Sequence, residues 1–263
     1  MNRARRRPPL IVAGAATIAV LFFAIPLIGI LQRADWATVW DDLTTDQARG
    51  ALRLSLICSL SAAGLSVLFG TPLAWMLARV QVPGRPLIRG LVLLPMVLPP
   101  VVGGVALLAA FSLRSPVGGW LDDTFGIQLT FSTAGAIMAE TFVSMPFYVI
   151  TVEGALRSMD QRFEDAAASL GAGRLTVFRR VTLPLIAPSV AAGAVLAWAR
   201  ALGEFGATIT FAGNIAGRTR TLPLAVYLEL ESDQQAATAL SLVLLVISLV
   251  VLVSLRDRWL TRA

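Results

Sequence analysis

The sequence predicts an all-α polytopic membrane protein with six transmembrane helices. Of its 263 residues, 56% are hydrophobic and only 14% are charged, which is more apolar than a soluble domain of this length requires. Apolar runs recur along the chain, and each is about 20 residues long, the length that crosses the hydrocarbon core of a bilayer. All 22 basic residues are arginines, and they concentrate in alternate connecting segments. These three observations favour a helical bundle inside a membrane.

Six apolar segments supply the expected spans. The first follows a basic N-terminus and is expected to remain uncleaved, because further spans follow it. The segment after it, 32–50, is polar and acidic and carries Trp36 and Trp40, which suit a membrane interface. The six expected spans are 10–31, 52–77, 87–111, 133–156, 189–211 and 237–255.

The arginines predict the orientation and the division of the chain. With the N-terminus inside, fifteen of the 22 arginines fall in inner segments, against six in the outer loops and at their borders. This excess places both termini in the cytoplasm. The chain then divides into 1–47 (cytoplasmic tail, first span and external segment), a core of five spans at 48–255, and a cytoplasmic tail at 256–263.

Residue types that the chain lacks exclude several classes of chemistry. Without lysine there is no Walker A sequence, and without histidine there is neither a histidine-based catalytic triad nor a histidine metal site. The single cysteine, Cys58, excludes an internal disulfide. We therefore expect no catalytic residues, no metal and no cofactor held by this chain. The net charge of +6 follows from arginines placed in loops, so no nucleic-acid partner is expected.

The charged stretch 157–188 is predicted to form a cytoplasmic docking loop. Its apolar residues recur with helical spacing and so share one face. Glu164 and Asp165 fall in the first turn, where carboxylates favour the helix dipole, and Gly171 can adopt the left-handed C-terminal cap. Because methyl groups make up much of the apolar face, another protein can approach it closely. The residues of that face are Phe163, Ala166, Ala167 and Leu170.

This stretch resembles a motif of the permease subunits of ATP-binding-cassette importers. Their cytoplasmic motif reads Glu-Ala-Ala, three residues, Gly, nine residues, then Ile-x-Leu-Pro. Here Asp165-Ala-Ala167, Gly171 and Val181-Thr-Leu-Pro184 keep that spacing, with Asp165 in place of Glu and Val181 in place of Ile. Glu164 stands one position earlier, so either carboxylate could carry the family's role. The alternative is an ordinary amphipathic loop.

Two of the expected spans carry residues that could line a path for solute. In the fifth, Arg200, Glu204 and Thr208 share one helical stripe, and a charge near mid-bilayer costs about 2.5–3.5 kcal/mol, so these side chains should face protein or water. Arg200 and Glu204 either form a structural ion pair or, with Thr208, line a path in which Arg200 and Thr208 donate to an anion. In the third span, three prolines should bend or break the helix, as a packing kink or as a wall of the path. They are Pro95, Pro99 and Pro100.

The residues of the fifth span restrict the resemblance to one group of importer permeases. The run from Arg200 to Asn214, followed by Thr219-Arg-Thr-Leu-Pro223, is similar to molybdate-importer permeases, and the resemblance covers roughly residues 48–255. Sulfate-importer permeases are similar but tend to carry Tyr where Phe205 stands. The resemblance implies a type I ABC importer permease fold in the bacterial inner membrane. It also implies that the loop around Gly171 passes the closure of the ATPase to the spans.

The partners and the solute that we expect follow from this resemblance. It implies a homodimer of the permease, two ATPase subunits that hold ATP and Mg, and an external solute-binding protein. The solute would be an oxyanion, with molybdate expected and tungstate, sulfate or thiosulfate as alternatives. A candidate from another class is an ion-coupled secondary transporter that uses Glu140, Glu153 and Glu204.

Overall fold

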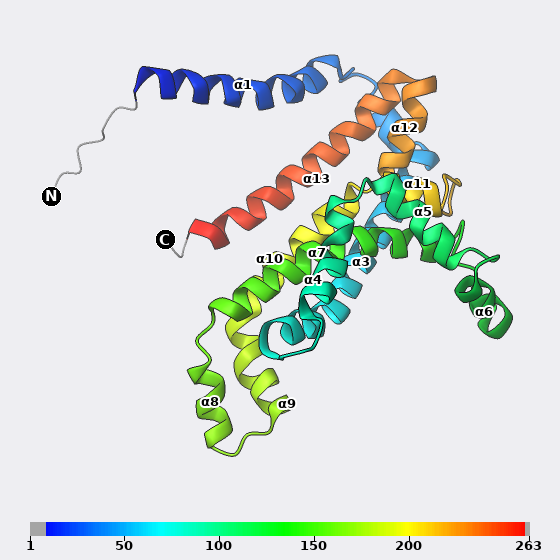
Figure 1. Ribbon diagram of the computed structural model, residues 1–263. Coiled ribbons are helices and arrows are strands. Elements are labelled where there is room, and N and C mark those ends of the chain that lie inside the picture. The colour runs from blue at the N-terminus through cyan, green and yellow to red at the C-terminus, as the bar shows by residue number, and fades with distance from the viewer. Residues whose placement is uncertain (1–8, 261–263) are drawn as a thin grey trace.

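The computed structural model describes residues 9–260, and within that range it contains helices and no strand (Figure 1). The elements are α1 (Leu10–Arg33), α2 (Val39–Thr44), α3 (Asp46–Arg79), α4 (Arg85–Val97), α5 (Pro100–Phe111), α6 (Pro116–Phe125), α7 (Thr133–Ser158), α8 (Arg162–Ser169), α9 (Arg174–Val177), the π-helical turn η1 (Phe178–Thr182), α10 (Leu183–Leu202), α11 (Gly206–Phe211), α12 (Leu222–Ser232) and α13 (Gln234–Leu260).

The prediction of an all-helical membrane protein is confirmed. Among the described residues, five helical stretches are long and apolar enough to cross a bilayer, and a sixth is obtained if α5 and α6, bent by 56°, form one broken span. The five are α1, α3, α7, the continuous run Arg174–Leu202, and α13 over Gln234–Val251. The N-terminal arginines at positions 3 to 7 and the last three residues of the predicted C-terminal tail lie outside the described residues.

The third predicted span, 87–111, is not one continuous helix. It is divided between α4 and α5, which are separated by Leu98 and Pro99 in extended conformation. The cause is local, because a residue that precedes a proline is pushed out of the α region, and here both Leu98 and Pro99 precede one. Pro95, by contrast, lies inside α4. The broken helix expected from the prolines is present, and the break falls at Leu98–Pro99.

The prediction of one helix over 189–211 is wrong. The helix ends at Leu202, and α11 begins at Gly206 after three non-helical residues. The carboxylate of Glu204 accepts a hydrogen bond from the amide of Ala207, at 2.8 Å, and so satisfies one of the free N–H groups at the start of the new helix. Arg200, Glu204 and Thr208 therefore do not form one continuous stripe.

Helices α3, α7 and α10 form the centre of the bundle, and Tyr148 of α7 lies between the other two. A Cβ atom on Gly70 of α3 would lie 2.7 Å from Cδ1 of Tyr148, and one on Gly193 of α10 would lie 3.2 Å from its Cδ2. The ring is fully buried, and its hydroxyl lies 2.6 Å from Oγ1 of Thr71. The two glycines thus make room for the largest side chain of the core.

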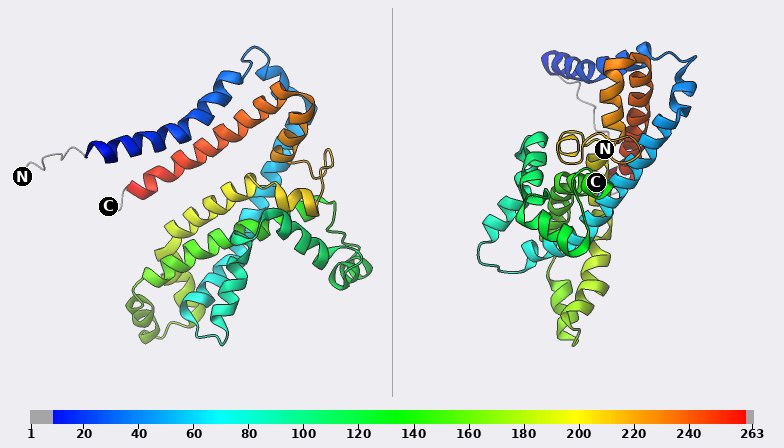
Figure 2. Two further views of the ribbon diagram at one scale, coloured as in Figure 1. Left: turned by 45° about the horizontal axis from the view of Figure 1, so that its top comes forward. Right: turned by 90° about the vertical axis from the view of Figure 1, so that its right-hand side faces the viewer.

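The molecule is elongated, with α8 and α9 at one end and α2 and α12 toward the other (Figure 1). Helix α1 stands apart from the bundle beside α13, and none of its residues is buried (Figure 2). Helix α3 begins earlier than predicted because the side chain of Thr45 caps it and accepts a hydrogen bond from the amide of Ala48 at 3.2 Å.

Because Gly70 lies against the buried ring of Tyr148 and Gly64 does not, alanine substitutions at these two glycines of α3 should change stability in opposite directions. Gly70→Ala should lower the free energy of unfolding by about 1–3 kcal/mol, because the added methyl group overpacks a buried ring. Gly64→Ala should instead raise it by about 0.5–1 kcal/mol, since a Cβ atom there meets nothing within 4 Å and alanine favours the helix. Thermal unfolding of the two variants in detergent measures the difference, and equal unfolding midpoints would contradict this packing of Tyr148.

Candidate functional site

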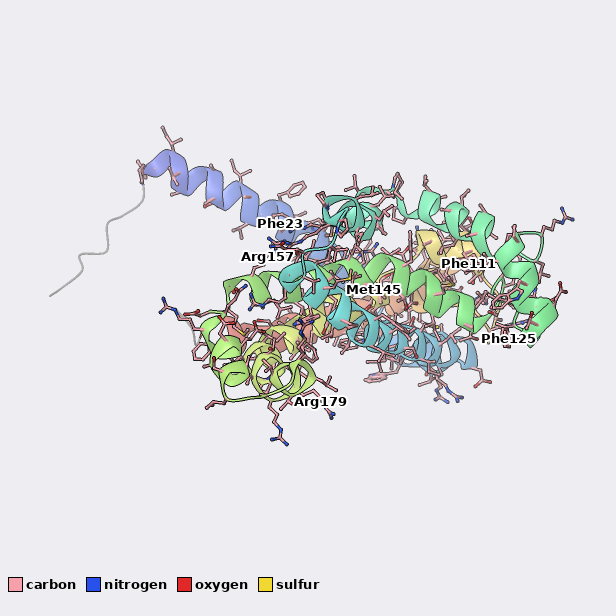
Figure 3. All side chains as sticks on the ribbon, turned by 60° about the horizontal axis from the view of Figure 1, so that its bottom comes forward. Phe23, Phe111, Phe125, Met145, Arg157 and Arg179 are labelled. Carbon is pink, nitrogen blue, oxygen red and sulfur yellow. The ribbon has the colours of Figure 1, made fainter. Side chains whose placement is uncertain are left out.

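The docking loop extends from one end of the bundle (Figure 1), and its apolar residues are exposed. Phe163 is 56% exposed and Leu170 is 89% exposed. Ala166 is also exposed, whereas Ala167 is half-buried. Arg179, which follows α9, points away from the bundle on the same loop (Figure 3). The predicted face therefore lies largely open on the surface of this chain, in the arrangement that a docking partner requires.

Gly171 ends α8 in the predicted left-handed conformation, with φ +84°. Its amide donates to the carbonyl of Ala168 at 2.9 Å, and the amide of Ala172 donates to the carbonyl of Ala167 at 3.1 Å. These two bonds are those of a Schellman motif, which satisfies carbonyls that the end of a helix leaves free. The sharp reversal that follows leads the chain into α9.

The two carboxylates in the first turn of α8 have different surroundings. Glu164 points toward the bundle: its Oε2 lies 3.0 Å from Nε of Arg79, and its Oε1 accepts a hydrogen bond of 2.6 Å from Oγ1 of Thr182. Asp165 is exposed. The sequence left open which of the two carries the coupling role, and Arg79, in the short loop after the second predicted span, gave no sign that it would pair with Glu164.

Pro184 lies in the first turn of α10 and is exposed. It follows a π-helical turn, η1, in which the amide of Leu183 bonds the carbonyl of Phe178. A proline has no N–H to donate and its ring crowds the preceding turn, so a helix that continues through it needs such an adjustment. The docking loop therefore joins the bundle through a widened turn of helix.

Arg200 and Glu204 form the ion pair that the sequence suggested. Nη2 of Arg200 lies 2.7 Å from Oε2 of Glu204, whose side chain is 1% exposed, while that of Arg200 is 27% exposed. Because the other oxygen of Glu204 caps α11, the pair also fixes the break between α10 and α11. Its geometry is that of a structural pair with one accessible cationic end.

Two further polar side chains are buried in the interior of the bundle. Thr208 of α11 is fully buried and its hydroxyl has no hydrogen-bond partner within the described chain. Glu140 of α7 is 1% exposed, and one of its oxygens likewise lacks a partner there. Glu140, Glu153 and Glu204 are thus acidic side chains buried among the described helices.

The structure brings only part of the predicted path together. The breaks of the third and fifth segments are adjacent, since a Cβ atom on Gly206 would lie 2.7 Å from Cβ of Pro100. Pro99 and Pro100 are exposed. Pro95 instead lines a cavity of about 680 Å³ among α3, α4, α5 and α7, whose lining is apolar apart from Thr141. The hydroxyl of Thr141 already donates to the carbonyl of Ile137 at 2.6 Å, so the lining offers an anion no free donor and the cavity is unsuited to one.

A comparison with protein families matches residues 70–263 to the inner membrane component of binding-protein-dependent transport systems. The match covers most of the chain, including the docking loop and both broken segments. The chain belongs to this family. It is therefore a transport subunit of the inner membrane, as expected, and the ATPase of such importers is a separate subunit.

Two curated relatives are similar along most of their length. The molybdenum transport system permease protein ModB of Mycobacterium bovis is 48% identical over 92% of each chain. The sulfate transport system permease protein CysT of Salmonella typhimurium is 38% identical over 89% of this chain and 86% of its own. The permease fold is also that of a solved bacterial ABC transporter for alginate, with a TM-score of 0.73 and 22% identity over 97% of this chain and 96% of that one.

The cap of α8 predicts a contrast between two neighbouring glycines. Gly171→Ala should destabilise the C-terminal end of α8 by about 1–2 kcal/mol, because residues with a side chain are strained in the left-handed region. Gly173→Ala should cost little, since the φ of Gly173 is −67° and nothing lies within 4 Å of its added Cβ atom. Hydrogen exchange of the peptide 162–173 measures the effect: it should accelerate in the first variant alone. Unchanged exchange in both would contradict the role of the cap.

Proposed function

We propose that this chain is the permease subunit of an ATP-driven importer that carries molybdate into the cell. The observation that carries the proposal is the 48% identity with a molybdenum permease, which extends over 92% of the chain. The exposed apolar face of α8 supports ATP hydrolysis by a partner subunit as the energy source. A chain without a Walker A sequence needs such a partner, and this face offers it a surface to bind.

The assembly that we propose contains two copies of the permease, two ATPase subunits and an external solute-binding protein. ATP and Mg are held by the ATPase subunits, and this chain holds neither. The ATPase binds the face of Phe163, Ala166, Ala167 and Leu170. Asp165, exposed on the same helix, is available to a basic group of the partner, and Gly171 sets the turn that shapes the contact.

The docking loop lies on the cytoplasmic side in this proposal, and both termini do too. Contacts within the chain support one common side for several basic segments: Arg79 reaches Glu164 of the docking loop, and Arg89 and Arg157 both pair with Glu153, at 3.5 and 2.7 Å. An arginine-rich end of a bundle faces the cytoplasm by the positive-inside rule.

The transport cycle that we propose is alternating access. The solute-binding protein delivers the oxyanion to the outer face, closure of the ATPase on ATP moves the docking loops, and the path opens outward. Hydrolysis and release reset the bundle and open the path inward. Arg200, with its partly accessible guanidinium, offers the charge that an oxyanion needs along the path, and the adjacent helix breaks at Pro99 and Glu204 are where the bundle can change shape.

Two alternatives are weighed against molybdate import. Sulfate or thiosulfate import is supported by the 38% identity with a sulfate permease. An ion-coupled secondary transporter is disfavoured by family membership. Of its three candidate carboxylates, Glu153 and Glu204 have arginine partners in the described structure and so are poor carriers of a proton or a sodium ion, whereas no arginine partner is found for Glu140 there.

Reconstitution tests the proposed function. The permease, its ATPase and its solute-binding protein in proteoliposomes should accumulate labelled molybdate only when ATP is supplied. A tenfold excess of tungstate should compete, and the same excess of sulfate should not. Uptake that runs on an ion gradient without ATP would contradict the importer, whereas sulfate-sensitive, ATP-driven uptake would reassign the solute alone.

The ion pair of the broken segment supplies a second test. Arg200→Leu should abolish uptake and also lower stability by about 3–5 kcal/mol, because it leaves the buried carboxylate of Glu204 unpaired. The double variant Arg200→Leu with Glu204→Leu removes both charges and should recover most of the stability while uptake stays lost. Uptake and thermal unfolding are measured on the same preparations. If the double variant recovers uptake as well, Arg200 serves only the structure and does not serve the solute.

A further inference from the structure

The docking loop is attached to the bundle through one carboxylate. Glu164 extends inward from α8 and meets Arg79, the last residue of α3, at 3.0 Å and the hydroxyl of Thr182 in η1 at 2.6 Å. Arg79 also approaches the carbonyl of Met159, where α7 ends and the docking loop begins, at 3.4 Å from Nη2. The end of α3, the first turn of α8 and η1 therefore meet at this carboxylate.

This junction is shielded from solvent, unlike the other charged groups of the docking loop. The side chains of Arg79 and Glu164 are 8% and 16% exposed. Asp165, Arg174, Arg179 and Arg180 are exposed, and no ion pair is found for them within the described part of the chain. A shielded ion pair is screened less by salt and solvent than an exposed one, so it holds its two helices more firmly.

The two partners of Glu164 lie at the ends of long helices: Arg79 ends α3, and Thr182 precedes α10. Helix α3 has 34 residues, which corresponds to about 50 Å and exceeds the thickness of the hydrocarbon core. Thr182 is the last residue of η1, from which α10 continues. Turns of π-helix occur often at functional sites. Glu164 therefore fastens α8 both to the inner end of α3 and to the widened turn that precedes α10.

We propose that Glu164 is a positioning residue that transmits movement of the docking loop to α3 through Arg79 and to α10 through Thr182. When the ATPase displaces α8, the shielded carboxylate makes the inner ends of both helices follow. Without it, α8 moves against the bundle and ATP is hydrolysed without transport. The proposal rests on the proposed function and assigns two separate roles. The face of α8 binds the ATPase, and Glu164 transmits the displacement of α8 to the bundle.

The test measures molybdate uptake per ATP hydrolysed in the reconstituted complex. Glu164→Gln and Arg79→Gln should each lower this ratio about tenfold, while the complex assembles and its ATPase continues to turn over. The double variant Arg79→Glu with Glu164→Arg should restore at least half of the ratio, because the pair is re-formed with reversed charge and the hydroxyl of Thr182 can accept a hydrogen bond as well as donate one.

Arg157→Gln is the matched control. It removes an ion pair at the same end of the bundle and within a single helix, and Glu153 keeps Arg89 as a partner. The ratio should stay within twofold of the wild type. A normal ratio in Glu164→Gln, or a fall as large in Arg157→Gln, would overturn the proposal.

Further variants and controls distinguish a failure of the Glu164 linkage from a failure of assembly or of the proposed function. If Glu164→Gln does not assemble, Thr182→Val removes only the hydrogen bond, and its ratio should fall by two- to fivefold; an unchanged ratio in that variant overturns the proposal. A wild-type complex that hydrolyses ATP and accumulates no oxyanion would contradict the proposed function, whereas normal wild-type uptake with unaffected variants would contradict the linkage alone.

Discussion

A peptide group inside a bilayer has no water to bind, and this constraint decides where the bundle can interrupt its helices. The two interruptions, at Leu98–Pro99 and at Gly203–Phe205, are adjacent rather than facing lipid separately, because α5 packs closely on α11. At the first, proline removes two donors that would otherwise need partners. At the second, Glu204 accepts a hydrogen bond from the amide of Ala207. At this second break, Glu204 therefore supplies from within the protein a hydrogen-bond partner that the bilayer cannot offer.

Two ion pairs of the bundle have different roles. Arg200 and Glu204 satisfy each other and the backbone inside the membrane region, so their pairing is a condition for the break. Arg79 and Glu164 pair at the end of the bundle, where α3, α7 and the docking loop converge. The first pair maintains the shape of the segment through which solute is proposed to pass, and the second joins that bundle to the surface on which an ATPase is proposed to act.

The fold of this chain does not by itself indicate which solute is transported. A solved alginate importer has the same fold with 22% identity, so this arrangement of helices tolerates replacement of most side chains. Its solute is unrelated to an inorganic oxyanion, which shows that the fold by itself carries little information about what is transported.

The sequence by itself determined the helical membrane class, the family motif, the exposed face of α8 and the left-handed Gly171, because these depend on local hydrophobicity, helical spacing and glycine geometry. It also indicated the broken third segment, since consecutive prolines act on their own neighbours. Only the tertiary structure decided that the fifth segment breaks at Glu204, that Tyr148 lies between Gly70 and Gly193, and that Glu164 rather than Asp165 turns inward. Each of these depends on which atoms of distant segments come together, as with Arg79 and Thr182 around Glu164, and no local pattern of residues carries that information.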